Sequence, residues 1–399
     1  MSDSRFWRKV VQSIVTSETA AVLPGPDAAV SAAIARASAR LPAPGTRVVV
    51  AMSGGVDSSV VAALAHSHGC ETIGVTLRLS DSPDSPGREG ACCAGSDIAD
   101  ARAIADAQGF THYVLDYASA FRAEVIEDFA DQYLAGRTPV PCIRCNQTVK
   151  FRDLLAVARD LGAHALLTGH YVQRIDDSGE PQLHRAIDPS KDQSYFLFTT
   201  TARQLSLLGF PLGGLDKPMV RLLARHFGLR VADKPDSQDI CFVPDGDYRA
   251  VVKRIRPEAE SPGDIVDLEG RVLGRHAGLI GFTVGQRRGT EIGGQVEPLY
   301  VVRLEPAANR LVLGPRSALA VSTVLLDGLN WLAGPVPEDG LDVMVKLRSM
   351  APLAPARLFD GDAPRLMFPA PQFGVSAGQA AVCYAGTRVL GGGFIASAT

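Results

Sequence analysis

The chain has 399 residues, of which 46% are hydrophobic and 21% charged. This composition is typical of a soluble globular protein, and the length predicts two or three domains. No apolar run approaches the roughly eighteen residues that a membrane span needs, and no clear signal-peptide core follows the basic amino terminus, so we expect a cytoplasmic protein with no membrane partner. The formal net charge of −3 gives no overall attraction for nucleic acid, so an RNA-binding surface would have to come from local basic patches.

The first 45 residues are rich in alanine and proline, and we expect a loosely attached extension with at most one helix, between Asp27 and Arg40. A continuous apolar run at 47–52 predicts a strand buried on both faces of a parallel sheet. Helix and strand patterns then alternate, which indicates βαβ units with right-handed crossovers. The expected helices are 58–69, 97–109, 121–136 and 149–162, and the expected strands are 72–79, 111–117 and 163–172.

Beyond about residue 250 the pattern changes to short β-rich segments separated by glycine turns. Residues 263–274 and 299–314 are each expected to form a hairpin. The chain is therefore divided into four parts. These are an extension (1–45), an α/β domain (46–250), a small central β domain (251–316) and a carboxy-terminal β-barrel (317–399).

The stretch AMSGGVDSSV, residues 51–60, joins the first strand to the first helix. Its glycine pair permits a tight turn, and the backbone amides and dipole of the helix start favour an anion there. Asp57 conflicts with a phosphate unless a Mg²⁺ ion bridges the two. The string is neither GxxxxGK[ST] nor GxGxxG, and an ordinary turn with a serine cap is the alternative.

SGGVDSS instead resembles the PP-loop of ATP pyrophosphatases, enzymes that split ATP between the α and β phosphates and adenylate an oxygen. The resemblance implies that ATP, with Mg²⁺, binds to the loop, and it makes Asp57 a candidate catalytic residue. The implied ATP-binding residues are Ala51, Met52, Ser53, Gly54, Gly55, Val56, Asp57 and Ser58. The loop alone does not choose between adenylating synthetases and tRNA thiolases.

Further strings follow in order along the chain: GRTPVPCIRCNQTVKF (136–151), TGHYV (168–172), KDQSYFL (191–197), DSQDICFV (236–243) and GQRRG (285–289). With the loop, they resemble the tRNA-specific 2-thiouridylase family from about residue 46 to the end. The resemblance implies a PP-loop domain of the adenine nucleotide alpha hydrolase type, a central β domain and a β-barrel. It also implies ATP-dependent adenylation of the wobble uridine (U34), followed by sulfur transfer from a cysteine persulfide to give 2-thiouridine. The partners would be tRNA and a persulfide donor or relay protein.

The chain contains seven cysteines, and an odd number without a secretion signal argues against structural disulfides. Cys70 and Cys383, in apolar surroundings, are expected to fill the core, and no thiol role is favoured for Cys92 and Cys93. The other cysteines are Cys142, Cys145 and Cys241.

The chemistry needs two thiols, because one carries the sulfur and another releases it by disulfide exchange. Cys145 is expected just before a helix, where the dipole lowers a thiol pKa. By the resemblance, Cys145 is the nucleophile, Cys241 bears the persulfide, and the two form a transient disulfide.

The resemblance assigns further contacts. Leu77 would pack on the adenine and Gly169 would touch the nucleotide, although Leu77 could equally be a core residue. The implied tRNA contacts are His170, Lys191, Asp192, Gln193, Arg348 and Gln379, with Arg287 and Arg288 as candidate phosphate contacts. A stacked uridine hides its carbon 2, so the target base should be flipped into the site. A packed histidine and a solvated turn are the alternatives at 170 and 191–193.

Val140 and Cys142 stand where many family members carry asparagine and aspartate. Cys142 and Cys145 form a C-x-x-C pair, which could be a resolving dithiol or, with Cys241, three ligands of a [4Fe–4S] cluster. Two other functions remain open. The first is a different PP-loop synthetase that adenylates a small molecule and needs no cysteine pair. The second is a zinc-stabilised RNA-binding module, which would lack its second cysteine pair.

Overall fold

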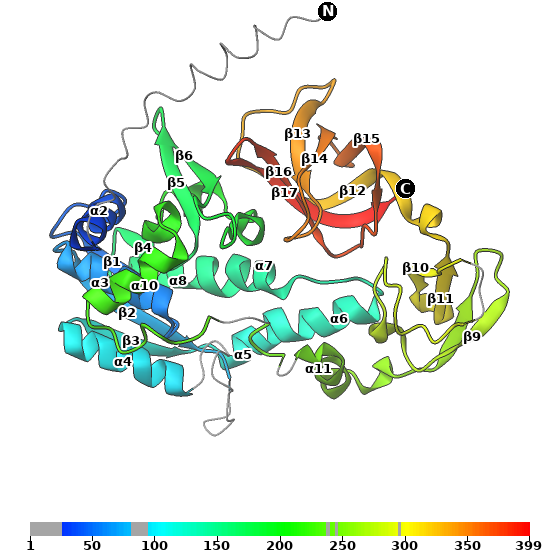
Figure 1. Ribbon diagram of the computed structural model, residues 1–399, viewed down its shortest axis with the longest axis horizontal. Helices are drawn as coiled ribbons and strands as arrows, with labels where there is room; N and C mark the ends of the chain where they lie inside the picture. Colours follow the sequence, from blue (N-terminus) through cyan, green and yellow to red (C-terminus); the bar gives the residue numbers. More distant parts are fainter. Residues whose placement is uncertain (1–25, 81–94, 237–239, 244–245, 294–296) are drawn as a thin grey trace, which may run out of the picture.

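The computed structural model describes residues 26–80, 95–236, 240–243, 246–293 and 297–399 (Figure 1). Cys92 and Cys93 lie outside these residues. Among the described residues, no helix is long and apolar enough to cross a membrane. The strands form a five-stranded, a four-stranded and an eight-stranded sheet, and the predicted fold class, a parallel α/β domain followed by β domains, is confirmed.

The parallel sheet has the strand order β3-β2-β1-β4-β7. Its strands are β1 (Arg47–Ala51), β2 (Glu71–Arg78), β3 (Thr111–Asp116), β4 (Ala165–Leu167) and β7 (Leu208–Gly209). Val48, Val49 and Val50 are fully buried, because helices cover both faces of the sheet. The strand order reverses between β1 and β4, and ligands of open α/β sheets bind at the carboxyl ends of strands flanking such a point.

The alternating side chains of β1 divide the core into two layers. Val48 and Val50 pack with α2, α3, α4 and α10, whereas Val49 packs on the other face with the helical segments 118–127 and 141–160. The helices of the first layer are α2 (Pro26–Ser38), α3 (Val56–Ser67), α4 (Gly95–Gln108) and α10 (Lys217–His226). Those of the second are α5 (Ala118–Phe121), η1 (Arg122–Glu127), α7 (Pro141–Cys145), η2 (Asn146–Asp153) and α8 (Leu154–Asp160). Helix α6 (Asp128–Leu134) continues from η1 and packs in a separate cluster.

The described part of the amino-terminal extension is attached to this domain rather than loose. In α2, Ala33 and Ala37 are buried against the first core layer. The Arg40 guanidinium donates to Gln173 Oε1 at 3.0 Å. The expected helix is therefore present, and its small alanines allow it to lie close to α3 and α10.

The central domain has the strand order β10-β11-β8-β9. Its strands are β8 (Gly263–Val266), β9 (Val272–His276), β10 (Tyr300–Glu305) and β11 (Arg310–Gly314). Both expected hairpins are present as antiparallel pairs. Helix α11 (Tyr248–Ile255) precedes this domain and packs its valines on Phe129 and Tyr133 of α6.

The carboxy-terminal domain is a closed six-stranded barrel, because β12 pairs with both β15 and β17. Its strands are β12 (Ala320–Trp331), β13 (Leu341–Lys346), β14 (Ala354–Phe359), β15 (Arg365–Phe373), β16 (Ala380–Ala385) and β17 (Arg388–Ala398). Glycine is required where the barrel closes, since a Cβ on Gly391 would lie 2.2 Å from the Asn330 carbonyl oxygen.

A hairpin of the α/β domain joins the barrel to it. The hairpin strands are β5 (Val172–Asp177) and β6 (Glu180–Arg185), and β6 pairs with β17. The short elements that follow are η3 (Ser194–Leu197), α9 (Ala202–Leu205) and η4 (Pro211–Gly214). Tyr195 of η3 anchors the interface, because its hydroxyl donates to the Ala380 carbonyl of β16 at 3.0 Å.

Candidate active site

A cleft of about 360 Å³ opens at the carboxyl ends of β1, β2 and β4. Ala51 ends β1, Leu77 lies near the end of β2, and Gly169 follows β4. The predicted residues that line the cleft are Ala51, Met52, Ser53, Gly55, Val56, Asp57, Ser58, Leu77, Cys142, Cys145, Gly169, His170, Lys191, Gln193 and Cys241. The structure therefore brings the nucleotide loop and all three motif cysteines to one place.

The loop is shaped by its first glycine and by its serines. Gly54 has a φ of +73°, and a Cβ there would lie 2.1 Å from the Asp97 carbonyl oxygen, so no other residue fits. The Ser53 N–H donates to Ser58 Oγ at 3.1 Å, and Ser59 Oγ donates to the Gly55 carbonyl at 2.8 Å. The N-cap residue of α3 is Gly55, which has no side chain to accept from the first amides, so these amides can bind an anion.

Lysine neutralises the Asp57 carboxylate, which the sequence left unexplained beside a phosphate. Lys217 Nζ lies 2.7 Å from Asp57 Oδ1 and 2.8 Å from Oδ2, and the Tyr171 hydroxyl donates to Oδ1 at 2.8 Å. Burial raises the pKa of Tyr171, and the neighbouring Asp57 charge adds to that shift, so the hydroxyl stays a donor. Lys217 is only 8% exposed, and it had not been singled out because it lies 160 residues from Asp57.

Asp236 is a second carboxylate shared among cations. It accepts from Lys191 at 2.7 Å, from Arg221 at 2.8 Å and from Lys217 at 3.0 Å. Partial burial would raise the pKa of Asp236, but the hydrogen bonds from the two lysines outweigh burial and lower the pKa to about 2. Asp236 is the first residue of the string DSQDICFV. The string was singled out for Cys241, and the ion pairs of Asp236 were not predicted.

A third lysine holds the loop against α4. Lys234 Nζ lies 2.5 Å from Asp97, 2.8 Å from Asp100 and 3.1 Å from the Gly54 carbonyl oxygen. Each carboxylate that lines the cleft is thus bound to a lysine. Among the described residues, no three His, Cys, Asp or Glu side chains are grouped so that they could hold a metal ion. Cys142, Cys145 and Cys241, the possible cluster ligands, are among the described residues to which this applies.

The position of Cys145 differs from the prediction. The helix begins at Pro141, and the backbone stays in the right-handed helical region through Cys145 and Asn146 into η2. Cys145 is therefore the fifth residue of a helical run, not the residue before a helix, and it is 7% exposed. The exposed Cys142, rather than Cys145, lies in the first turn of this helix. The wide turn of η2 directly after Cys145 is of a kind common at functional sites.

Cys70 and Cys383 are core residues, as expected, whereas Cys241 lies at the cleft. Cys70 and Cys383 are buried, and burial raises the pKa of Cys383 to about 12, so both are core residues. Cys241 is half-buried and packs against the core layer that contains Phe121 and Cys145. The two candidate working thiols thus share one apolar wall of the cleft.

His170 faces the cleft as a neutral ring. Its Nδ1 lies 2.9 Å from Thr168 Oγ1, and Phe151 meets the ring edge-on at 5.7 Å between centroids. Burial, and secondarily the charge of Lys150, lowers the pKa of His170 to about 3. The ring therefore presents a neutral imidazole to the cleft near neutral pH.

Three of the predicted tRNA contacts lie outside the cleft lining. The Asp192 carboxylate is 2% exposed and binds Arg185 at 2.8 Å. Arg348 donates to the Gly374 and Val284 carbonyls. Gln379 Nε2 donates to the Thr138 carbonyl at 2.9 Å. Arg348 and Gln379 thus connect the barrel to the central domain and to the segment that precedes Cys142.

The sequence matches known protein families along most of its length. Family models described as a tRNA methyl transferase HUP domain, a tRNA methyl transferase PRC-barrel domain and an aminomethyltransferase beta-barrel domain match residues 46–245, 249–315 and 321–395. A protein of Rhizorhabdus wittichii named tRNA-specific 2-thiouridylase MnmA is 63% identical over 88% of this chain and 92% of its own length. The protein of the same name from Zymomonas mobilis is 61% identical over 88% of this chain and 94% of its own. The chain belongs to the tRNA-specific 2-thiouridylase family.

Solved structures resemble the chain only distantly. An NMN synthetase from Francisella tularensis, 16% identical, covers 58% of this chain and 87% of its own, with a TM-score of 0.35. The U34-tRNA thiolase NcsA from Methanococcus maripaludis, 14% identical, covers 59% and 72% with a TM-score of 0.37. At this level of similarity neither structure carries an argument about the 2-thiouridylase cleft.

Proposed function

We propose that the chain is an ATP-dependent tRNA-uridine 2-sulfurtransferase that converts the wobble uridine (U34) to 2-thiouridine. The observation that carries the proposal is the shared cleft, in which the SGGVDSS loop stands beside Cys145 and Cys241. A nucleotide loop and two cysteines in one cavity suit a reaction that first activates an oxygen and then replaces it with sulfur.

In the first half of the reaction, the loop amides and the start of α3 bind the ATP phosphates. Leu77 and Gly169, at the strand ends, leave room for the adenosine. The uridine O2 attacks the α-phosphorus and pyrophosphate leaves, which makes O2 part of an AMP leaving group. Asp57 orients the loop through its bonds to Lys217 and Tyr171.

In the second half, Cys241 carries a sulfane sulfur taken from a persulfide donor. The terminal sulfur attacks carbon 2, and AMP departs with the original oxygen. The Cys145 thiolate then attacks the Cys241 sulfur, which breaks the S–S bond and leaves the terminal sulfur on the base as 2-thiouridine. A Cys145–Cys241 disulfide results, and a dithiol reductant must return both residues to thiols.

The RNA would reach the cleft past the residues assigned to tRNA. Lys191, His170 and Gln193 line the cleft, which supports assigning them to contacts with a flipped uridine. Asp192, Arg348 and Gln379 are engaged in contacts between segments, and we assign them to shaping the tRNA surface. Arg287 and Arg288 are exposed and remain candidate phosphate contacts.

ATP would bring its own Mg²⁺. The ion neutralises phosphate charge, but the cleft carboxylates Asp57, Asp97 and Asp236 are each paired with lysine, so these three described acids offer no ready pair for it. The described cysteines do not form a metal-holding group either, and no step proposed here uses an iron–sulfur cluster.

A reaction in vitro tests the function. The purified chain, unmodified tRNA, ATP and a persulfide donor should yield 2-thiouridine at position 34 and one AMP per thiolated base, as nucleoside mass spectrometry and nucleotide chromatography would show. A different PP-loop synthetase would form AMP with a small-molecule acceptor and without tRNA. An equal rate of AMP formation with and without tRNA would therefore reject the thiolase assignment.

A further inference from the structure

The ammonium of Lys217 is shared between two carboxylates. Its Nζ lies 2.7 and 2.8 Å from the two oxygens of Asp57 and 3.0 Å from Oδ1 of Asp236. Lys217 opens α10, lines the cleft and lies 5.8 Å from the centre of the Tyr171 ring. It is therefore a nearly buried cation beside the nucleotide loop, and its charge is held by two acids.

The two contacts of Lys217 are not equally easy to exchange. An ammonium has three donors, and the three nearby carboxylate oxygens occupy them, so a nucleotide phosphate must replace one of these oxygens. Asp236 would keep Lys191 and Arg221 as cationic partners, whereas Asp57 would keep the Tyr171 hydroxyl. A carboxylate that keeps two cations loses less by the exchange than one that keeps a neutral hydroxyl.

We propose that Lys217 is a phosphate-binding residue of the adenylation step, and that it exchanges Asp236 for a phosphate oxygen of ATP while remaining bound to Asp57. Negative charge develops on the phosphates as the oxygen of uridine attacks. A fixed ammonium would stabilise that charge more strongly in a partly water-excluded cleft than in bulk water. The inference rests on the proposed use of ATP.

Lys234 is less suited to this task. Its ammonium is already bound to Asp97, Asp100 and the Gly54 carbonyl. Both of these acids belong to α4, so the contact ties that helix to the loop. Moving Lys234 to a phosphate would undo the packing that shapes Gly54.

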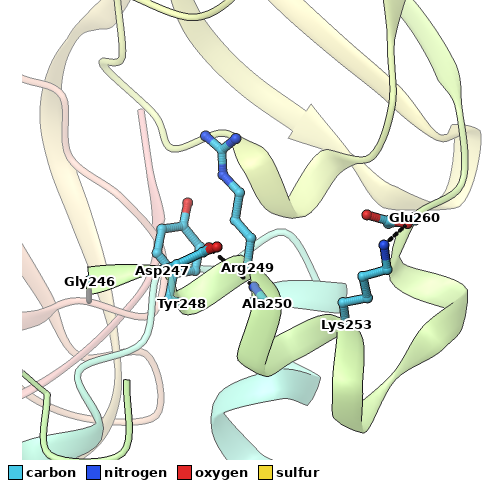
Figure 2. Close-up of a pocket in the computed structure, with 7 residues that line it drawn as sticks. All are labelled: Gly246, Asp247, Tyr248, Arg249, Ala250, Lys253 and Glu260. Atoms are coloured by element: carbon cyan, nitrogen blue, oxygen red, sulfur yellow. Dashed lines mark hydrogen bonds and ion pairs between the residues drawn. The ribbon is translucent and has the colours of Figure 1, made fainter. Parts of the chain in front are cut away.

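Binding measurements with ATP and with adenosine separate a phosphate contact from a structural one. In Lys217→Gln, the Kd for ATP should rise about tenfold or more, the scale of a charge-assisted hydrogen bond, while the Kd for adenosine stays within about twofold. Lys217→Arg keeps the charge and should lie between wild type and Lys217→Gln. The matched control is Lys253→Gln, which removes the ammonium that pairs with Glu260 at 2.6 Å in a separate hollow beside α11 (Figure 2).

The Asp236→Asn variant tests the exchange itself. Because Lys217 would no longer have to leave a carboxylate, ATP should bind about two- to fivefold more tightly, the scale of one partly exposed ion pair. Unchanged ATP affinity in Lys217→Gln, or an equal loss for ATP and adenosine, overturns the phosphate contact. Weaker ATP binding in Asp236→Asn overturns the exchange. If the wild-type chain bound no ATP at all, the proposed function would fail instead.

Discussion

Gly169 packs directly against the backbone of the nucleotide loop, and alanine at this position should displace the loop. A Cβ on Gly169 would lie 2.9 Å from the Ser58 backbone nitrogen and 3.1 Å from the carbonyl carbon and Cβ of Asp57. The backbone of Gly169 is not left-handed, so alanine adds a steric contact and no dihedral strain. The nearest obstacle is backbone, which cannot rotate away as a flexible side chain would.

The size of the effect follows from this contact. Relief requires the loop to move by a few tenths of an ångström, and overpacking of this kind costs about 1–3 kcal/mol. If that cost falls on the ATP-bound arrangement of the loop, the Kd for ATP rises about 5- to 150-fold. If the cost falls on the whole fold, the free energy of unfolding drops by a similar amount, so the two cases are separable.

Calorimetric titration with ATP and urea unfolding of the same samples provide the measurement. The control is Gly334→Ala, because a Cβ on the exposed Gly334 meets no heavy atom within 4 Å and its φ is not positive. It should match wild type in both assays. The steric argument is refuted if Gly169→Ala binds ATP with wild-type affinity and also unfolds at the wild-type urea concentration.

Three further predictions concern the thiols and Asp236. Cys145→Ser and Cys241→Ser should each abolish 2-thiouridine formation while filter binding of tRNA persists, and wild-type turnover by the Cys241 variant would contradict the persulfide assignment. Cys142 should be a spare thiol beside Cys145 rather than a cluster ligand, so anaerobically purified protein should be fully active without iron, and near-stoichiometric iron that disappears in Cys142→Ala would instead establish a cluster. The pKa of Asp236, about 2 when folded against about 3.9 when unfolded, means that its contribution to stability is complete above about pH 4 and disappears as the pH falls towards 2. The difference in urea midpoint between wild type and Asp236→Asn should therefore shrink over that range, and a constant difference would contradict the linkage.

Local patterns determined the order of elements and the chemistry of the motifs. The apolar run at β1 and the alternation that follows predicted a parallel sheet, because burial on both faces and the helical period are visible in neighbouring residues. The glycine pair predicted a loop between strand and helix, and Gly54 indeed has a positive φ. The central hairpins were predicted from glycine turns for the same local reason.

Some assignments needed the folded chain because they depend on residues far apart in sequence. The pairing of Asp57 with Lys217 and the docking of the segment that ends at Arg40 join residues more than a hundred positions apart. Asp236 meets Lys191, Lys217 and Arg221 from separate elements, which no local pattern indicates. The helix start at Pro141 was also missed, since Cys142 and Cys145 carry no periodic apolar pattern and the turn is held by tertiary packing of Ile143 and its neighbours. Side-chain periodicity records which face of an element is buried, but it carries no information about which distant charge will meet that face. The sequence alone therefore determined the motifs and their chemistry, whereas the tertiary structure decided which lysines neutralise the acids of the cleft.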